Sequence, residues 1–218
     1  MGVLAETDQH PRLSWAYTND VTHYWFDPPK ARAILDADGW KLGSDGVRVK
    51  RGRRLEFSLI HASGSSRPTP KEIYLQREWR DVGAMVDIES YPASRFAENS
   101  AAGIIEGGHY DVADYTWYNA ADPDDSSYFS ADNLAPHGQN TTRWTNLRAT
   151  TAINDALRTV DRARRRRDYI IVQKQLTRDL PTIILYFLRV PYVYNSDLKG
   201  FEPSSVVTAY WDPWNYSI

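Results

Sequence analysis

Residues 55–88 read LEFSLIHASGSSRPTPKEIYLQREWRDVGAMVDI, and this stretch decides the fold class. It opens with residues 55–60, which alternate between apolar and polar side chains before they become continuously apolar, so we predict a strand. After a loop rich in Gly, Ser and Pro, residues 71–82 show apolar side chains at helical spacing, and Gly83 ends that helix. A second short strand is expected at residues 85–88. Strand, helix and strand in this order predict an α/β unit.

The alternation of helices and strands continues on both sides of this unit. Upstream, Asp27 and Pro28 have the residue types of an N-cap and a first helical position, and Gly39 ends that helix. Downstream we expect, in chain order, a helix at 94–105, a strand at 110–117, helices around 153–160 and at 161–179, and a buried strand at 182–188. We therefore predict an α/β fold with a mixed central sheet flanked by helices.

The composition of the 218-residue chain excludes several classes of protein. With 26 basic and 28 acidic residues the formal net charge is −2, which lacks the basic excess typical of nucleic-acid binding. The absence of cysteine excludes disulfide scaffolds, thiolate zinc sites and cysteine nucleophiles. No apolar run reaches the roughly 18 residues that a membrane helix needs, and no signal peptide is visible.

Sequence signatures of enzymes are missing as well. The chain has no glycine-rich phosphate loop, no paired histidines on a helix and no serine at a nucleophile elbow. Its five histidines are dispersed along the sequence. We therefore predict no catalytic residue, no metal site and no cofactor.

Two charged clusters suggest ligands but have simpler interpretations. The run RARRRR at residues 162–167 falls in a predicted helix, where 100° of rotation per residue spreads the guanidinium groups around the surface. We interpret it as a solvated helix start. The acidic stretch that begins at Asp122 lacks calcium-loop spacing, because Ser127 and Asn133 replace the required Gly and acidic ligand. A solvated turn or a polar ligand contact is expected there.

Aromatic residues are the unusual feature of the composition, with 14 Tyr, 8 Trp and 6 Phe. Tyr115, Trp117 and Tyr118 stand at the C-terminal end of a predicted strand, the place where ligands bind in α/β sheets. Their rings could form apolar walls for a ligand, and the long polar loop at 118–146 could orient polar groups. Tyr115 and Trp117 fall on one face of the strand and could equally be core residues. We expect one of the two in the core and the other at a site.

Several segments together resemble the peptide-type solute-binding proteins of ABC importers. Residues 25–40, WFDPPKARAILDADGW, are similar to the family motif Y-D-P-x-K-A-x-x-L-L-x-x-A-G-W. Shorter motifs follow in the family's order, at residues 46–48, 52–55, 80–83, 108–111, 117–124, 140–146, 161–173, 181–186 and 200–201. Together they span about residues 24–215, and they resemble the C-terminal part of a family whose members bind oligopeptides, dipeptides or nickel.

This resemblance implies a fold, a division of the chain and a set of partners. The fold would be a lobe of the type II periplasmic-binding-protein class, one of two lobes that close over a ligand. Residues 1–24 would form a hinge segment, residues 25–195 the C-terminal ligand-binding lobe, and residues 196–218 a tail returning toward the missing N-terminal lobe. The partners would be a peptide or other small solute and the membrane permease of an ABC importer, and the location would be periplasmic or otherwise extracytoplasmic.

The candidate ligand contacts fall in two loops that follow strands. In the resemblance, aromatic rings wall the ligand, an amide and a carboxylate orient its polar ends, and the loop after the first strand offers backbone donors and a guanidinium for a carboxylate. The seven candidates are Tyr115, Trp117, Tyr118, Asn119, Asp122, Ser63 and Arg67.

One position departs from the family pattern. Peptide binders of this family commonly place Asp three residues after the strand-end Trp, where it holds the α-ammonium of the ligand, and here that position is Ala120. A buried ammonium without an anion would be costly. Either Asp122 takes this role through a different loop path, or the ligand is not a peptide with a free amino terminus.

Two other classes of function stay open. A carbohydrate-active enzyme or an aromatic-rich carbohydrate-binding domain would also use aromatics and carboxylates, and a glycosidase needs two carboxyl groups about 5–9 Å apart in one cleft. A cleft with perturbed carboxyl groups would favour the enzyme, whereas a one-sided aromatic face would favour the lobe. A protein-interaction module is the third class, since an isolated lobe exposes apolar surface.

Overall fold

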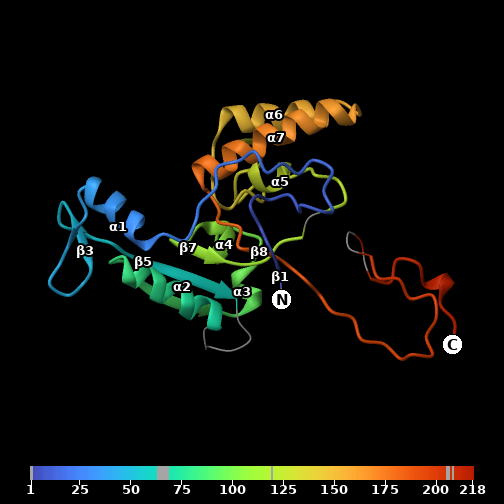
Figure 1. Ribbon diagram of the computed structural model, residues 1–218, viewed down its shortest axis with the longest axis horizontal. Coiled ribbons are helices and arrows are strands. Elements are labelled where there is room, and N and C mark those ends of the chain that lie inside the picture. The colour runs from blue at the N-terminus through green and yellow to red at the C-terminus, as the bar shows by residue number, and fades with distance from the viewer. Residues whose placement is uncertain (1, 63–68, 119, 205–206, 208) are drawn as a thin grey trace. The chain divides into compact units, whose positions relative to one another are not determined.

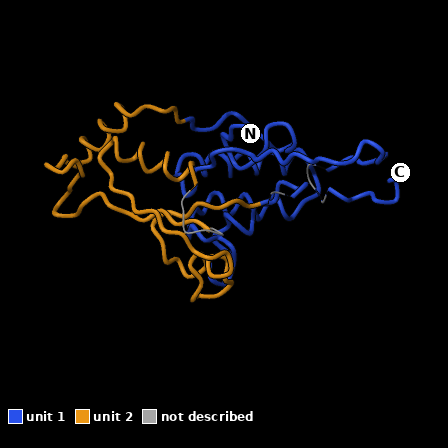
Figure 2. The backbone as a smooth tube through the Cα atoms, turned by 90° about the horizontal axis from the view of Figure 1, so that it is seen from below, with its two compact units in different colours: residues 1–23, 118–218 blue, residues 24–117 orange. Residues whose placement is uncertain are grey.

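The computed structural model describes residues 2–62, 69–118, 120–204, 207 and 209–218 (Figure 1). The chain divides into two compact units (Figure 2). Unit 2 is residues 24–117, and unit 1 combines residues 1–23 with residues 118–218. The expected division into a hinge segment, a ligand-binding lobe and a tail stays a prediction.

A parallel three-stranded sheet forms the centre of unit 2. Its strand order is β6-β5-β7, with β5 (Glu56–Ala62) between β6 (Met85–Tyr91) and β7 (Val112–Asp114). α2 (Pro70–Asp81) connects β5 to β6 and runs along the sheet (Figure 1). The strand–helix–strand unit expected from residues 55–88 is therefore confirmed.

Successive side chains of β5 point to opposite faces of this sheet. Phe57 points to the α2 face, where its ring lies 5.4 Å from the ring of Trp79. Ile60 points to the other face and is buried with Phe96, Ile104 and Ile105. Both faces of the sheet are thus covered, as is usual for parallel strands.

The face of the sheet opposite α2 is not covered by the single helix expected at 94–105. Two short helices stand there, α3 (Ala93–Phe96) and α4 (Ile104–Gly107). Between them the Ser100 hydroxyl donates to Glu98 Oε1 at 2.8 Å and the Gly103 N–H donates to the Ser100 carbonyl at 2.9 Å. These local turn contacts compete with helical hydrogen bonds, so the expectation of one continuous helix was wrong.

Antiparallel strands and a capped helix complete unit 2. α1 (Pro28–Ala37) begins at Asp27, whose carboxylate accepts from the Lys30 N–H at 2.9 Å, which confirms the expected N-cap. The antiparallel strands, paired in the order β2-β3-β4, are β2 (Lys41–Leu42), β3 (Arg48–Lys50) and β4 (Arg53–Arg54).

Arg48 joins these elements to the end of α2. Its buried guanidinium donates to Asp36 Oδ1 at 2.6 Å, to the Trp40 carbonyl at 2.8 Å and to the Val82 carbonyl at 2.8 Å. Gly83 is required beside it: its φ is +94°, and a Cβ there would lie 2.7 Å from Arg48 Cγ.

A pair of packed helices dominates unit 1. α6 (Leu147–Leu157) and α7 (Arg162–Asp179) bury Ile153, Tyr169 and Leu176. Residues 15–22 lie along α7, where the buried Gln173 amide donates to the Ala16 carbonyl at 2.9 Å. The remaining elements are β1 (Gly2–Leu4), α5 (Ser126–Phe129), β8 (Tyr186–Leu188) and the 3₁₀ turns η1 (Ala131–Asn133) and η2 (Pro213–Asn215).

One expectation about unit 1 was wrong, and a second was confirmed for all but one residue. The apolar run at 182–188 is not a buried strand: β8 has three residues and pairs with β1, and Ile183 and Leu188 are 64% and 58% exposed. Four of the five arginines at 162–167 are exposed, as expected for a solvated helix start. Arg165 is the exception at 17% exposure, and the guanidinium groups of Arg162 and Arg165 lie 4.9 and 5.5 Å from the Trp15 ring. In both cases tertiary partners distant in sequence decided the outcome. Among the described residues, no helix combines the length and apolar character needed to cross a bilayer.

Candidate functional site

The carboxyl ends of the three parallel strands in unit 2 bring polar residues into one row. The pairing register places His61 of β5 opposite Ser90 of β6 and opposite Asp114 of β7. His61 is buried, and its Nε2 lies 2.6 Å from the Ser90 hydroxyl. Crevices beyond the carboxyl ends of such strands are where α/β proteins bind ligands.

The first turn of α2 adds a cation to this row. Lys71 Nζ lies 2.6 and 2.8 Å from the two carboxylate oxygens of Asp114. Burial raises the pKa of the Asp114 carboxyl, and Lys71 opposes that rise through its hydrogen bond and charge. The result is an ion pair that caps the end of β7.

Glu72 is a fully buried acid beside this ion pair. Its Oε2 accepts from the Thr69 N–H at 2.6 Å and also from the Thr69 hydroxyl, which forms the capping box that starts α2. Burial acts to raise the pKa of Glu72, but the hydrogen bonds from Thr69 and from backbone N–H groups, together with His61, hold it below its ordinary value. Glu72 thus fixes the helix start at the edge of the sheet.

Replacing Glu72 by alanine removes this cap. We expect the Glu72→Ala variant to lose about 1–2 kcal/mol of stability, because the Thr69 N–H loses its acceptor. For a chain of this size the melting temperature should fall by about 3–6 °C. The control is Glu78→Ala in the same helix, where the carboxylate pairs with the exposed Arg77 at 2.8 Å. Equal melting temperatures for the two variants would contradict the capping role.

Aromatic residues continue the chain beyond β7. Tyr115 is half-buried, and its ring lies 6.4 Å from the Phe96 ring and 6.1 Å from the Trp117 ring. Tyr115 therefore packs against the core cluster around Ile60, and Trp117 stands one ring further out. Ligand contact by either residue stays a prediction. Ser63 and Arg67, the candidates after β5, lie outside the described residues.

The loop after Trp117 belongs to unit 1 and holds the other candidates. Tyr118 is 88% exposed, and Asn119 lies outside the described residues. Asp122 forms a bidentate ion pair with Arg165 of α7, with N–O distances of 2.5 and 2.8 Å.

Arg165 was missed as a partner because helical rotation alone treated the arginine run as solvated. Its side chain is only 17% exposed and also donates to the Tyr169 hydroxyl at 2.9 Å. The hydrogen bonds that Arg165 donates to Asp122 raise the pKa of Arg165 further above its ordinary value. The signal in the sequence that could have found this ion pair is the acidic stretch that begins at Asp122, which offers partners to the basic helix start at 162–167.

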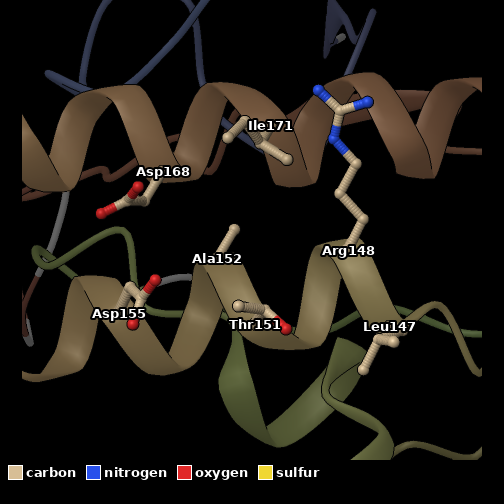
Figure 3. A pocket seen from close by; sticks show the side chains of 7 residues that line it. All are labelled: Leu147, Arg148, Thr151, Ala152, Asp155, Asp168 and Ile171. Carbon is tan, nitrogen blue, oxygen red and sulfur yellow. The ribbon is translucent and has the colours of Figure 1, made fainter.

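A groove of about 430 Å³ lies between α6 and α7 in unit 1 (Figure 3). Asp155 and Asp168 approach each other from the two helices at one end of it. Burial and, next, the negative charge of Asp155 raise the pKa of Asp168, and Arg164 and Arg167 oppose this. No aromatic side chain is among its seven lining residues, which are Leu147, Arg148, Thr151, Ala152, Asp155, Asp168 and Ile171. Within the described part of the chain, no three His, Asp or Glu side chains gather as a metal ion would require.

Comparison with known proteins gives a consistent assignment. Residues 2–139 match the family described as "Bacterial extracellular solute-binding proteins, family 5 Middle". The chain is 32% identical over 113 residues to an oligopeptide-binding protein OppA from Lactococcus lactis subsp. cremoris, a match that covers 48% of this chain and 18% of OppA.

Solved structures share the fold. NikZ from Campylobacter jejuni, solved in complex with Ni(L-His), superposes with a TM-score of 0.79 at 25% identity and covers 97% of this chain and 43% of its own. The oligopeptide-binding protein AppA from Bacillus subtilis, solved with a nonapeptide, gives 0.81 at 21% identity and covers 100% and 42%. The type II periplasmic-binding-protein architecture expected from the sequence is thus confirmed. The chain spans less than half the length of these relatives.

Proposed function

Because the chain belongs to the bacterial extracellular solute-binding proteins of family 5, we propose that it is the C-terminal lobe of a receptor that captures a peptide or similar solute for an ABC importer. The observation that carries this proposal is the carboxyl edge of the parallel sheet in unit 2. There a half-buried aromatic pair, Tyr115 and Trp117, directly follows β7, whose end is capped by the Lys71–Asp114 ion pair.

The side chains at this edge support a binding role. Tyr115 packs against the core residue Phe96, and the Trp117 ring packs against Tyr115, so the core limits the motion of both rings. Rigid aromatic walls bind solutes at low conformational cost. Tyr118 would add a further ring, while Asn119, Asp122, Ser63 and Arg67 would orient polar groups of the ligand.

The proposed mechanism is closure of two lobes over the solute. Each lobe supplies part of the contacts, and closure expels water from the cleft between them. The N-terminal lobe of the same receptor and a membrane permease are the proposed partners, and the proposed location is periplasmic or extracytoplasmic.

A binding role without catalysis is supported over a carbohydrate-active enzyme. The groove with the perturbed Asp168 lacks the aromatic platforms that sugar rings stack on. At the carboxyl edge of the sheet, the buried Glu72 carboxylate accepts from Thr69, and the partly buried Asp114 carboxylate pairs with Lys71. The aromatic contacts lie instead beyond β7, as a one-sided binding face requires.

The direct test is native mass spectrometry of the full-length protein purified without refolding. A carried peptide, opine, sugar or metal chelate should appear as added mass that disappears on denaturation. Turnover of glycoside substrates by the same preparation would overturn the binding role.

The 218-residue chain alone is expected to bind solute weakly. If each lobe supplies only part of the contacts, the chain should lose at least about a hundredfold in affinity relative to the full-length protein, or about 2.7 kcal/mol. Calorimetry on both proteins with the same solute measures this difference. A cooperative thermal melt of the chain is the control for folding, and equal affinities would contradict the two-lobe mechanism.

A further inference from the structure

The start of α7 directs three of its arginines to one side. Arg165 and Arg166 follow Arg162 by three and four positions, so the three side chains share one face of the helix. The Arg162 guanidinium lies 4.9 Å from the Trp15 ring, and Arg166 donates to the Trp15 carbonyl at 3.3 Å. This face of α7 therefore holds both the ring and the backbone of Trp15.

Arg165 is confined by two aromatic side chains. Its guanidinium lies 5.5 Å from the Trp15 ring and 5.4 Å from the Tyr169 ring, and it donates to the Tyr169 hydroxyl at 2.9 Å. Tyr169 is 2% exposed and belongs to a buried cluster with Ala16 and Ala156. The position of the guanidinium is therefore set by the core of unit 1.

The same guanidinium binds the loop after Trp117. Both oxygens of Asp122 accept from Arg165, at 2.8 and 2.5 Å, and such a two-bond contact between planar groups fixes direction as well as distance. Asp122 precedes Pro123, and a residue before proline is restricted to extended backbone conformations. An oriented carboxylate on a restricted backbone fixes the end of this loop.

The ion pair is unequally buried. The Arg165 side chain is 17% exposed, whereas the Asp122 side chain is 48% exposed. Moving the loop away would leave a largely buried guanidinium without its anion, which is costly, so the pair keeps the loop on α7. The more open Asp122 carboxylate can still accept a hydrogen bond from a bound solute.

We propose that Arg165 is a positioning residue for solute binding, which acts by holding Asp122 and with it the loop after Trp117. This proposal rests on the proposed function. A guanidinium is required, because the ammonium of a lysine cannot form the planar two-bond contact with a carboxylate. The fold then orders the loop before the solute arrives, and solute affinity rises because binding no longer has to order it.

Arg165→Lys in the full-length protein tests this role. Native mass spectrometry gives affinities for the alanine peptides of two to five residues and for any solute that the purified protein carries. Because lysine keeps the charge but loses the two-bond contact, each affinity should fall about tenfold. Arg164→Lys, at an exposed position of the same helix, is the matched control and should stay within about twofold of the wild type.

Asp122→Asn probes the same contact from the loop, at a half-exposed side chain. It should lower the affinities by a similar factor. The double variant with Arg165→Lys should lose no more than either single variant, because both changes remove one contact. Independent losses, about a hundredfold in the double variant, would overturn the positioning role. All affinities are measured well below the melting temperature of every variant, so a loss of stability alone leaves them unchanged.

Hydrogen exchange separates this proposal from the proposed function, because it needs no solute. In the solute-free protein, the amides of residues 120–122 should exchange faster in Arg165→Lys than in the wild type and in Arg164→Lys. Equal exchange in all three proteins would overturn the proposal, and so would faster exchange with unchanged affinities. A full-length wild type that binds no solute at all would instead contradict the proposed function.

Discussion

Trp117→Ala in the full-length protein is expected to weaken solute binding by about 1–3 kcal/mol, which is about tenfold to hundredfold in affinity. Trp117 stands beyond the core: its ring contacts the Tyr115 ring at 6.1 Å, and Tyr115 in turn packs on Phe96. The prediction is that the Trp117 ring, held on Tyr115, contacts the ligand. Removing it should therefore cost affinity more than stability.

The measurement pairs calorimetric titration with thermal melting for the same variants. Phe96→Ala is the matched comparison, because Phe96 is 4% exposed and belongs to the core cluster with Ile60. It should lower the melting temperature by far more than Trp117→Ala does, since truncating a buried Phe costs about 3–5 kcal/mol. If Trp117→Ala mainly lowers the melting temperature and leaves affinity intact, Trp117 is a core residue.

The parts of the fold that the sequence predicted are those in which local pattern and burial agree. In β5 the alternation of side chains predicts a strand with two faces, with Phe57, Leu59 and His61 on one and Ile60 on the other. In the structure Phe57 packs against α2 and Ile60 against the core cluster on the opposite face. The helix start at Asp27 could also be predicted from the sequence, because an N-cap depends only on residues within about four positions of each other.

The parts that the sequence did not predict depend on distant partners. Residues 182–188 are as apolar as a buried strand, but the only strand paired with β8 in the described part of the chain is the short β1, so no residue of the run is fully buried. Arg165 belongs to a run of similar residues, and only the position of Asp122 and Trp15 singles it out. No periodicity within a helix contains that information.

In the candidate site, too, the sequence predicted the features that depend on local pattern and missed those that depend on distant partners. Aromatic residues after a predicted strand pointed to the carboxyl edge of the sheet, and Tyr115 and Trp117 lie there. The polar row of His61, Ser90 and Asp114 was missed, since it arises from the register of three strands rather than from a motif. Polar residues at the ends of two apolar strands, His61 and Asp114, were the signal that could have found it.

N-acetylation of a peptide ligand is expected to change the affinity of the full-length receptor by less than about tenfold. The resemblance to peptide binders places an ammonium-holding Asp at the position of Ala120. Where such an anion is present, its loss typically costs about 3–5 kcal/mol, on the order of a thousandfold in affinity. Without it, the receptor should either tolerate a blocked amino terminus or prefer solutes that are not peptides.

Asp122 is the residue that could restore the interaction, and its ion pair argues against this role. Both of its oxygens hold Arg165, so the pair presents little net charge to a ligand ammonium. A ligand ammonium that displaced Arg165 would leave the Arg165 guanidinium, which is only 17% exposed, without its anion. The free-energy cost of that unpaired charge exceeds the gain from a new, solvated ion pair between the ammonium and Asp122. Asp122→Asn should therefore change the affinity for free and acetylated peptides equally.

Ala120→Asp is the variant that separates these alternatives. It should improve binding of the free-amino peptide and leave the acetylated form unchanged or weaker, because the new carboxylate supplies the missing anion. Calorimetry with one peptide and its N-acetyl form, on the wild type, Asp122→Asn and Ala120→Asp, gives six affinities, and thermal melts control for folding. A wild type that loses about a thousandfold on acetylation, together with an Asp122→Asn variant that weakens only for the free-amino form, would identify Asp122 as the ammonium partner and contradict the prediction.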